Sequence, residues 1–201
     1  MRQIALVLFL LLLSGCGAAR TTAPDTRFYT LEYDPPAVPG ERTDAVISLN
    51  RFGVAPEYNT AKIVYRDLSF GRQEYHYHQW RGTPQSLAAD YLRRDLQASG
   101  LFLAVAGTGS SLPATHRIEG MVEEWMEVDG QDRWLATAEL TVTLVDLRAG
   151  TIPDAVLFQR TYRESEPSGK KNPGSVVEAM SRVMRALSAR IIADVHAAVS
   201  R

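Results

Sequence analysis

The sequence of 201 residues contains a single cysteine, Cys16. A disulfide needs two cysteines, so none can form within the chain, and the apolar core must hold the fold together. An excess of one charge is also missing, because 22 basic and 23 acidic residues give a formal net charge of -1. Without a basic excess, nucleic acid is not expected as a partner.

Residues arranged for catalysis or cofactor binding are missing as well. The sequence has no GxSxG, HExxH or serine–lysine signature, and its glycine-rich stretch at 107–113 lacks the Lys-Ser/Thr of a phosphate-binding loop. Glu123, Glu124 and Glu127 lie in one predicted strand, where adjacent side chains point to opposite faces, so they indicate solvated charge. These absences favour a protein that is not an enzyme and needs no cofactor.

Metal ligands are too few to predict a metal site. His76 and His78 are two residues apart and would share one face of a strand. A metal site needs three or four convergent ligands, and no further histidine or cysteine recurs at ligand spacing. His116 and His196 stand alone in the sequence and are expected at the surface or its rim.

The N-terminal segment is the most distinctive pattern in the chain. Arg2 precedes an unbroken apolar run of ten residues that ends at Leu13. This run is half the length that a helix needs to cross a bilayer, so residues 1–15 are predicted to be an export signal. The letters LSGC that end at Cys16 resemble the lipobox of bacterial lipoproteins, which implies cleavage before Cys16 and its lipidation. An ordinary secretory signal cut after Ala19 is the alternative.

Residues 16–26 are predicted to be the lipidated cysteine and a flexible linker, because the stretch after Cys16 is small, polar and interrupted by proline. Fully extended, the linker reaches at most about 35 Å. Aspartate directly after the lipidated cysteine resembles a signal for retention in the inner membrane. This chain has Gly17 there, so the resemblance implies the outer membrane. Residues 27–201 are predicted to form a single domain that faces the periplasm.

Two segments of this domain, in which apolar residues recur at helical spacing, lie among predicted short strands. Thr83 and Pro84 predict the start of a helix that Gly100 ends, and Ser175 with Glu178 predicts a capping box for a long terminal helix. The pattern predicts an α+β fold with a mostly antiparallel sheet and two amphipathic helices packed on one face. The expected strands are 27–33, 45–54, 62–68, 73–79, 101–106, 116–128, 133–147 and 155–164, the sixth and seventh joined by Asp129-Gly130.

A series of short motifs occupies the first half of the domain. It comprises Phe28-Tyr29-x-Leu31, Pro56-x-Tyr58, Ile63-Val64-Tyr65-Arg66, Tyr75, Trp80, Pro84, Leu87, Leu92, Leu96 and Ser99-Gly100-x-Phe102. In order and spacing these motifs resemble the auxiliary lipoproteins of ABC-type transport systems, which accompany proteins of the MCE (mammalian cell entry) type. The second half of the chain matches that family only in its strand–strand–helix organisation.

The resemblance implies a non-enzymatic, periplasm-facing anchor at the outer membrane that docks an MCE-type protein of a lipid-transport system. Tyr65, Arg66, Tyr75 and Trp80 are the candidates for the partner-binding face, with core packing of Tyr65 and Trp80 as the alternative. Two other functions remain open. One is a lipoprotein that assists outer-membrane assembly or binds an envelope polymer, and the other is a periplasmic hydrolase. The sequence also leaves open whether the protein forms a homo-oligomer.

Overall fold

The structure is a computed structural model that describes residues 24–67 and 70–201. The predicted signal peptide at 1–15 and Cys16 lie outside the described residues. Within the described part, no helix combines the length and the apolar character that crossing a membrane requires.

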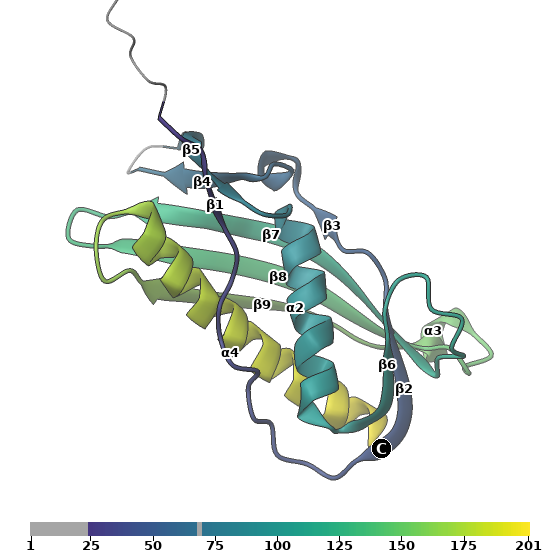
Figure 1. Cartoon of the computed structure of the whole chain (residues 1–201). Helices are drawn as coiled ribbons and strands as arrows, with labels where there is room; N and C mark the ends of the chain where they lie inside the picture. The colour runs from purple at the N-terminus through teal and green to yellow at the C-terminus, as the bar shows by residue number, and fades with distance from the viewer. Residues whose placement is uncertain (1–23, 68–69) are drawn as a thin grey trace, which may run out of the picture.

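The described residues form a mixed sheet with two long helices, so the predicted α+β class is confirmed. Figure 1 shows the helices α2 and α4 side by side in front of the sheet. The strands are β1 (Arg27–Tyr29), β2 (Thr43–Leu49), β3 (Gly53–Val54), β4 (Lys62–Arg66), β5 (Gln73–Trp80), β6 (Phe102–Ala106), β7 (His116–Asp129), β8 (Trp134–Asp146) and β9 (Val156–Pro167). The helical elements are η2 (Pro56–Tyr58), α2 (Pro84–Ser99), α3 (Ile152–Ala155) and α4 (Pro173–Val199).

The long strand β7 organises the sheet. On one side it pairs with β8 in antiparallel register, and β8 pairs with β9 in the same way. On its other side β7 takes β2, β3 and β4 in succession, and all three run parallel to it. The prediction of a mostly antiparallel sheet is therefore wrong. Three pairs of strands that are neighbours in sequence are antiparallel, namely β4–β5, β7–β8 and β8–β9. By contrast, β2, β3 and β4 pair with β7, which comes later in the chain than α2 and β6.

Both long helices have local signals at their ends. Pro84 opens α2, and Gly100 ends it in the left-handed conformation with φ of 68°, which glycine adopts without strain. The start of α4 differs from the prediction. Its N-cap is Asn172, whose side chain accepts a hydrogen bond of 3.0 Å from the Ser175 backbone N–H. The predicted capping box of Ser175 with Glu178 is therefore wrong, because Asn172 already satisfies that donor.

The core lies between the sheet and the helices. The inward row of β8 is fully buried, and α4 covers it, in contact with both β8 and β9. Trp80 and Trp125 pack edge to face there, with ring centroids 6.0 Å apart. The buried row on β8 is Ala136, Ala138, Leu140, Val142 and Leu144, as the alternation predicted.

The long strands give the molecule two distinct ends. The β5 end carries β1, β4, β5 and the turn between β7 and β8, and the described chain enters there (Figure 1). The β6 end carries β2, β6 and the last turn of α4, so the C-terminus lies far from the start of β1. The following sections use these two names for the two ends.

Candidate functional site

The four residues predicted for a partner-binding face all lie at the β5 end. Tyr65 and Arg66 come from β4, and Tyr75 and Trp80 come from β5, its antiparallel neighbour. Tyr65, Arg66 and Tyr75 are partly exposed. The structure therefore brings these three together at the surface of one hairpin.

Trp80 does not belong to the predicted partner-binding face. Its side chain is only 2% exposed and packs against Trp125 inside the core. Trp80 is the last residue of β5, shortly before α2 begins at Pro84. A buried tryptophan with an aromatic neighbour stabilises the fold and offers no surface to a partner.

A tyrosine cluster crosses β4, β5 and β1. The cluster consists of Tyr29, Tyr65, Tyr75 and His78. The rings of Tyr65 and Tyr75 lie 4.7 Å apart between centroids, and Tyr75 meets His78 edge to face at 5.5 Å. The Tyr29 hydroxyl lies 2.8 Å from His78 Nδ1. Parallel pairing of β1 with β5 puts Tyr29 beside Trp80 and thus on the same face as His78, which lies two residues before Trp80.

A buried carboxyl group lies beneath this cluster. The Tyr75 hydroxyl donates a hydrogen bond of 2.8 Å to Glu127 Oε1, and Glu127 has no exposed surface. Among the described residues, neither Glu127 Oε2 nor Asp129 Oδ1 has a hydrogen-bond partner. Burial first, and then the neighbouring Asp129, raise the pKa of Glu127 to about 8. Burial and the negative charge of Glu127 also raise the pKa of Tyr75.

The expectation that Glu127 is a solvated charge is wrong. Strand β7 contains a β-bulge between Val122 and Glu124, which shifts the alternation of side chains by one residue. Beyond the bulge, Trp125, Glu127 and Asp129 pair with β8 residues of the row that faces the helices. The alternation of the sequence alone gave no sign of this shift.

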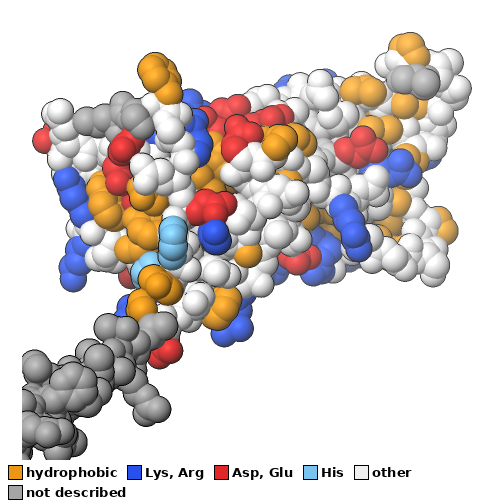
Figure 2. All heavy atoms as spheres, turned by 90° about the horizontal axis from the view of Figure 1, so that it is seen from above, with side chains coloured by type: hydrophobic (Ala, Val, Ile, Leu, Met, Phe, Trp, Pro, Cys, Tyr) orange, Lys and Arg blue, Asp and Glu red, His pale blue; other side chains and the backbone are white. Residues whose placement is uncertain are grey.

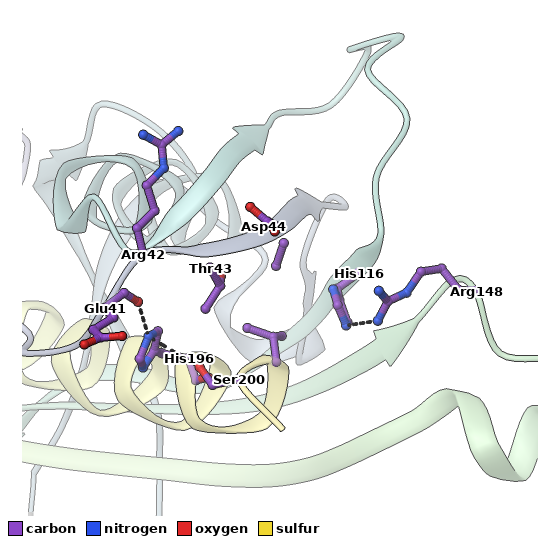
Figure 3. Close-up of a pocket in the computed structure, with 10 residues that line it drawn as sticks. Glu41, Arg42, Thr43, Asp44, His116, Arg148, His196 and Ser200 are labelled. Atoms are coloured by element: carbon purple, nitrogen blue, oxygen red, sulfur yellow. Dashed lines mark hydrogen bonds between the residues drawn. The ribbon is translucent and has the colours of Figure 1, made fainter.

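An open pocket of about 610 Å³ lies at the β6 end, between β2, the start of β7 and the last turns of α4. Figure 3 shows His116 and Arg148 on one side of it and Glu41, His196 and Ser200 on the other. The pocket is lined by Glu41, Arg42, Thr43, Asp44, Ala45, His116, Arg148, His196, Val199 and Ser200.

Arg148, which lines this pocket, is paired with Asp146 next to it. Arg148 donates two hydrogen bonds of 2.9 Å to the carboxylate of Asp146, and these bonds hold the pKa of Asp146 down at about 2. His116 Nε2 lies 3.2 Å from the same guanidinium group. His116 is 2% exposed, so the expectation of a surface histidine is wrong there, and burial lowers its pKa.

The second histidine of the pocket, His196, is not arranged as a general base. Its Nε2 lies 2.8 Å from the backbone carbonyl oxygen of Glu41, which can only accept a hydrogen bond. His196 Nε2 therefore carries the hydrogen and cannot take a proton from Ser200 Oγ, 3.5 Å away. The Ser200 hydroxyl instead donates to the backbone carbonyl of His196 at 2.8 Å.

The two histidines of β5 do not assemble a metal site in the described part of the chain. His78 is engaged with Tyr29 and Tyr75, and His76 is exposed. No group of three or more His, Cys, Asp or Glu side chains converges among residues 24–67 and 70–201. Glu127 and Asp129 together supply only two carboxyl groups, fewer than the ligands that a structural metal takes.

Comparison with known structures shows that this fold recurs. A crystal structure of a Xanthomonas campestris protein assigned to the family DUF330 shares 18% identity with a TM-score of 0.75, covering 86% of this chain and 96% of that one. A hypothetical protein from Chlamydia trachomatis shares 14% identity with a TM-score of 0.58, covering 78% of this chain and 98% of that one. At these identities the likeness is one of fold.

Comparison of sequences gives the family. A search among curated proteins finds no match. The model of one protein family, described as the ABC-type transport auxiliary lipoprotein component, matches residues 29–192. This range begins at Tyr29, the last residue of β1, includes the strands β2 to β9 and ends within α4. Since the match spans most of the sequence, the chain belongs to the family of ABC-type transport auxiliary lipoprotein components.

Proposed function

We propose that this protein is a non-catalytic adapter, anchored by lipid at Cys16 to the outer membrane, that docks an MCE-type subunit of an ABC lipid-transport system in the periplasm. The observation that carries the proposal is the family match over residues 29–192. The single cysteine at the end of an export signal supports the anchor. His116, His196 and Arg148 already form hydrogen bonds with other groups of the protein, and this supports a role without chemistry.

The partner face in this proposal is the exposed part of the β4–β5 hairpin, with Tyr65, Arg66 and Tyr75. Tyrosine and arginine are the residues enriched at the energetic centres of protein interfaces. Tyr65 also needs little further ordering, because its hydroxyl donates to Gln73 at 2.7 Å and its ring rests on Tyr75. A preordered aromatic pair loses less conformational entropy on binding than two free side chains would.

Affinity purification from solubilised envelopes tests this function. The tagged wild-type protein should recover an MCE-type protein, and the Arg66→Glu variant should recover much less of it. Arg42→Glu makes the same charge change at the exposed β6 end and should leave recovery unchanged. If the wild-type protein recovers only a barrel protein, peptidoglycan or lipopolysaccharide, the alternative function in outer-membrane assembly or polymer binding takes its place.

A further inference from the structure

An open cleft of about 720 Å³ lies at the β5 end, between β1 and the first turns of α4. Phe28, Thr30 and Glu32 line it on one side. Val177 and Glu178 line it on the other side, where α4 begins. Figure 2, which looks down on the molecule, shows hydrophobic side chains exposed beside the point where the described chain begins. We call this feature the β1–α4 cleft.

The strand β1 has a free edge. Among the described strands it pairs only with β5. The Tyr29 carbonyl oxygen accepts a hydrogen bond of 2.7 Å from the Arg81 N–H, so the backbone groups of Tyr29 point toward β5. Successive residues of a strand direct their N–H and C=O groups to opposite sides, so those of Phe28 point away from β5. This edge therefore offers a donor and an acceptor to a further extended chain.

The chain that follows β1 closes one end of the cleft. The Glu32 backbone N–H donates a hydrogen bond of 3.0 Å to Ser181 Oγ of α4, and Figure 1 shows this part of the chain crossing in front of the helix. Phe28 lies four residues earlier and is 53% exposed. The two walls therefore touch at Glu32, whereas the wall at Phe28 remains accessible.

The charges of the cleft favour a basic occupant. The exposed carboxylates of Glu32 and Glu178 lie one on each wall, and within residues 24–67 and 70–201 neither forms an ion pair. Two arginines also line the cleft. Arg182 is paired with Glu166 at 3.6 Å, so it is already neutralised. The two carboxylates then face one unpaired guanidinium group, that of Arg81, and negative charge is in excess.

We propose that the β1–α4 cleft binds an extended segment of another protein, which adds a strand to β1 and places a lysine or arginine side chain against Glu32 and Glu178. In strand addition, main-chain hydrogen bonds supply affinity and alternate side chains supply specificity. A lipid chain in the cleft would cover the Phe28 N–H and C=O without replacing their bonds to water, which is costly. A peptide backbone supplies both partners. The inference goes beyond the proposed function, because this cleft is separate from the exposed face of the β4–β5 hairpin.

Selection of peptides tests the proposal. A library of random dodecapeptides displayed on phage is panned against the tagged full-length protein, purified from envelopes in mild detergent. A surface that carries the tag alone serves for counter-selection. The enriched peptides should share a lysine or arginine next to apolar residues, since the exposed Phe28 ring offers an apolar contact. A synthetic, fluorescently labelled copy of the most enriched peptide then gives Kd by anisotropy.

Charge reversal locates the peptide. The double variant Glu32→Lys with Glu178→Lys should raise Kd at least about tenfold, and a peptide with glutamate in place of its basic residue should regain affinity for this variant. Glu57→Lys makes the same change at an exposed position of η2 and should leave Kd unchanged. Phe28→Ala is a second, milder variant and should weaken binding severalfold. Thermal melting verifies that each variant is folded.

Amide hydrogen exchange at single-residue resolution distinguishes strand addition from other modes of binding. Saturating peptide should slow exchange at the Phe28 N–H at least about tenfold and leave the Tyr29 N–H, which faces β5, unchanged. The proposal is overturned if no peptide is enriched, if the double variant binds the peptide as well as the wild type, or if exchange at Phe28 does not slow. Recovery of an MCE-type protein through the β4–β5 hairpin is measured separately, so either conclusion can fail while the other stands.

Discussion

Tyr75 donates a hydrogen bond of 2.8 Å to Glu127, and this contact joins a partly exposed ring to a carboxyl group with no exposed surface. The ring belongs to the tyrosine cluster at the β5 end, and the carboxyl group belongs to the central strand β7. The contact therefore couples the proposed partner face to the middle of the sheet. A partner that moved Tyr75 would leave Glu127 with an unsatisfied buried oxygen, which is costly.

Replacing Tyr75 by Phe should lower the free energy of unfolding by about 1–3 kcal/mol at neutral pH. The reason is that Glu127 Oε1 would lose its donor while it stays buried. Urea denaturation measures the change. Tyr65→Phe is the matched control, because its hydroxyl bonds to the exposed Gln73, which water can satisfy. Equal losses for the two variants would contradict the special role of Glu127.

The pH dependence of stability should carry the signature of Glu127. Its pKa rises from 4.5 in the unfolded chain to about 8 in the folded protein, so the folded state holds the extra proton between these values. The free energy of unfolding should therefore fall as pH rises from about 5 to about 8, by about 2–4 kcal/mol from this group. The stabilisation is complete below pH 4.5 and is lost above the folded pKa.

The variant Glu127→Gln isolates this effect, because glutamine keeps the shape and does not titrate. Urea denaturation of both proteins across this pH range gives the difference between them. The comparison also removes the contribution of His116, whose lowered pKa gives a slope of opposite sign near pH 6.5. The assignment of Glu127 as the buried acid fails if the variant keeps the full wild-type slope.

Truncating the middle of α4 should test whether its apolar stripe is core. Leu187 has no exposed surface, so Leu187→Ala should cost about 2–5 kcal/mol of unfolding free energy. Leu112→Ala removes the same atoms from a side chain that is 46% exposed, and it should cost well under 1 kcal/mol. Both values come from thermal or urea unfolding. A small loss at position 187 would mean that the stripe packs elsewhere.

The N-cap of α4 is Asn172 in the structure, whereas the sequence predicted Ser175 with Glu178. Asn172→Ala should destabilise the protein by about 0.5–2 kcal/mol, because the Ser175 backbone N–H would lose its acceptor. Glu178→Ala should have little effect, since the N-cap lies at Asn172 and not at Ser175. Equilibrium unfolding of the two variants ranks them. The reverse order would restore the capping box.

The anchor is tested at Cys16. Mass spectrometry of the mature protein from membranes should find an acylated cysteine at its N-terminus. Cys16→Ser should abolish both the acylation and the cleavage before this position, because the lipid is attached to the thiol. Thr22→Ser in the linker is the control and should behave as the wild type. Unchanged processing and membrane partitioning of Cys16→Ser would refute the lipoprotein assignment of this residue.

Local features of the fold are readable in the sequence because neighbouring residues encode them. The Asp129-Gly130 pair predicts the turn between β7 and β8, where any Cβ at Gly130 would meet the Arg133 carbonyl oxygen at 2.6 Å. Thr83, Pro84 and Gly100 predict both ends of α2. The helical period of the α4 stripe predicts its buried face, and the two-residue period of β8 predicts its inward row.

The candidate site was harder to predict because it depends on features without a local signal. Trp80 and Tyr75 lie on the same strand, yet Trp80 is core and Tyr75 reaches the surface. Register between β4 and β5 shifts within the hairpin, so simple alternation does not tell which β5 side chains point inward. The bulge in β7 similarly turned Glu127 from an expected surface charge into a buried acid.

The sequence by itself determined the positions of both long helices and the antiparallel pairs β4–β5 and β7–β8, whereas its export-signal and lipobox pattern stays a prediction. Tertiary structure alone decided that β2, β3 and β4 run parallel to β7, with Ile47 set beside His116, far along the chain. The physical reason is that period and turn chemistry act over a few residues, whereas parallel pairing and the burial of Glu127 depend on which distant strand supplies the neighbouring backbone and side chains.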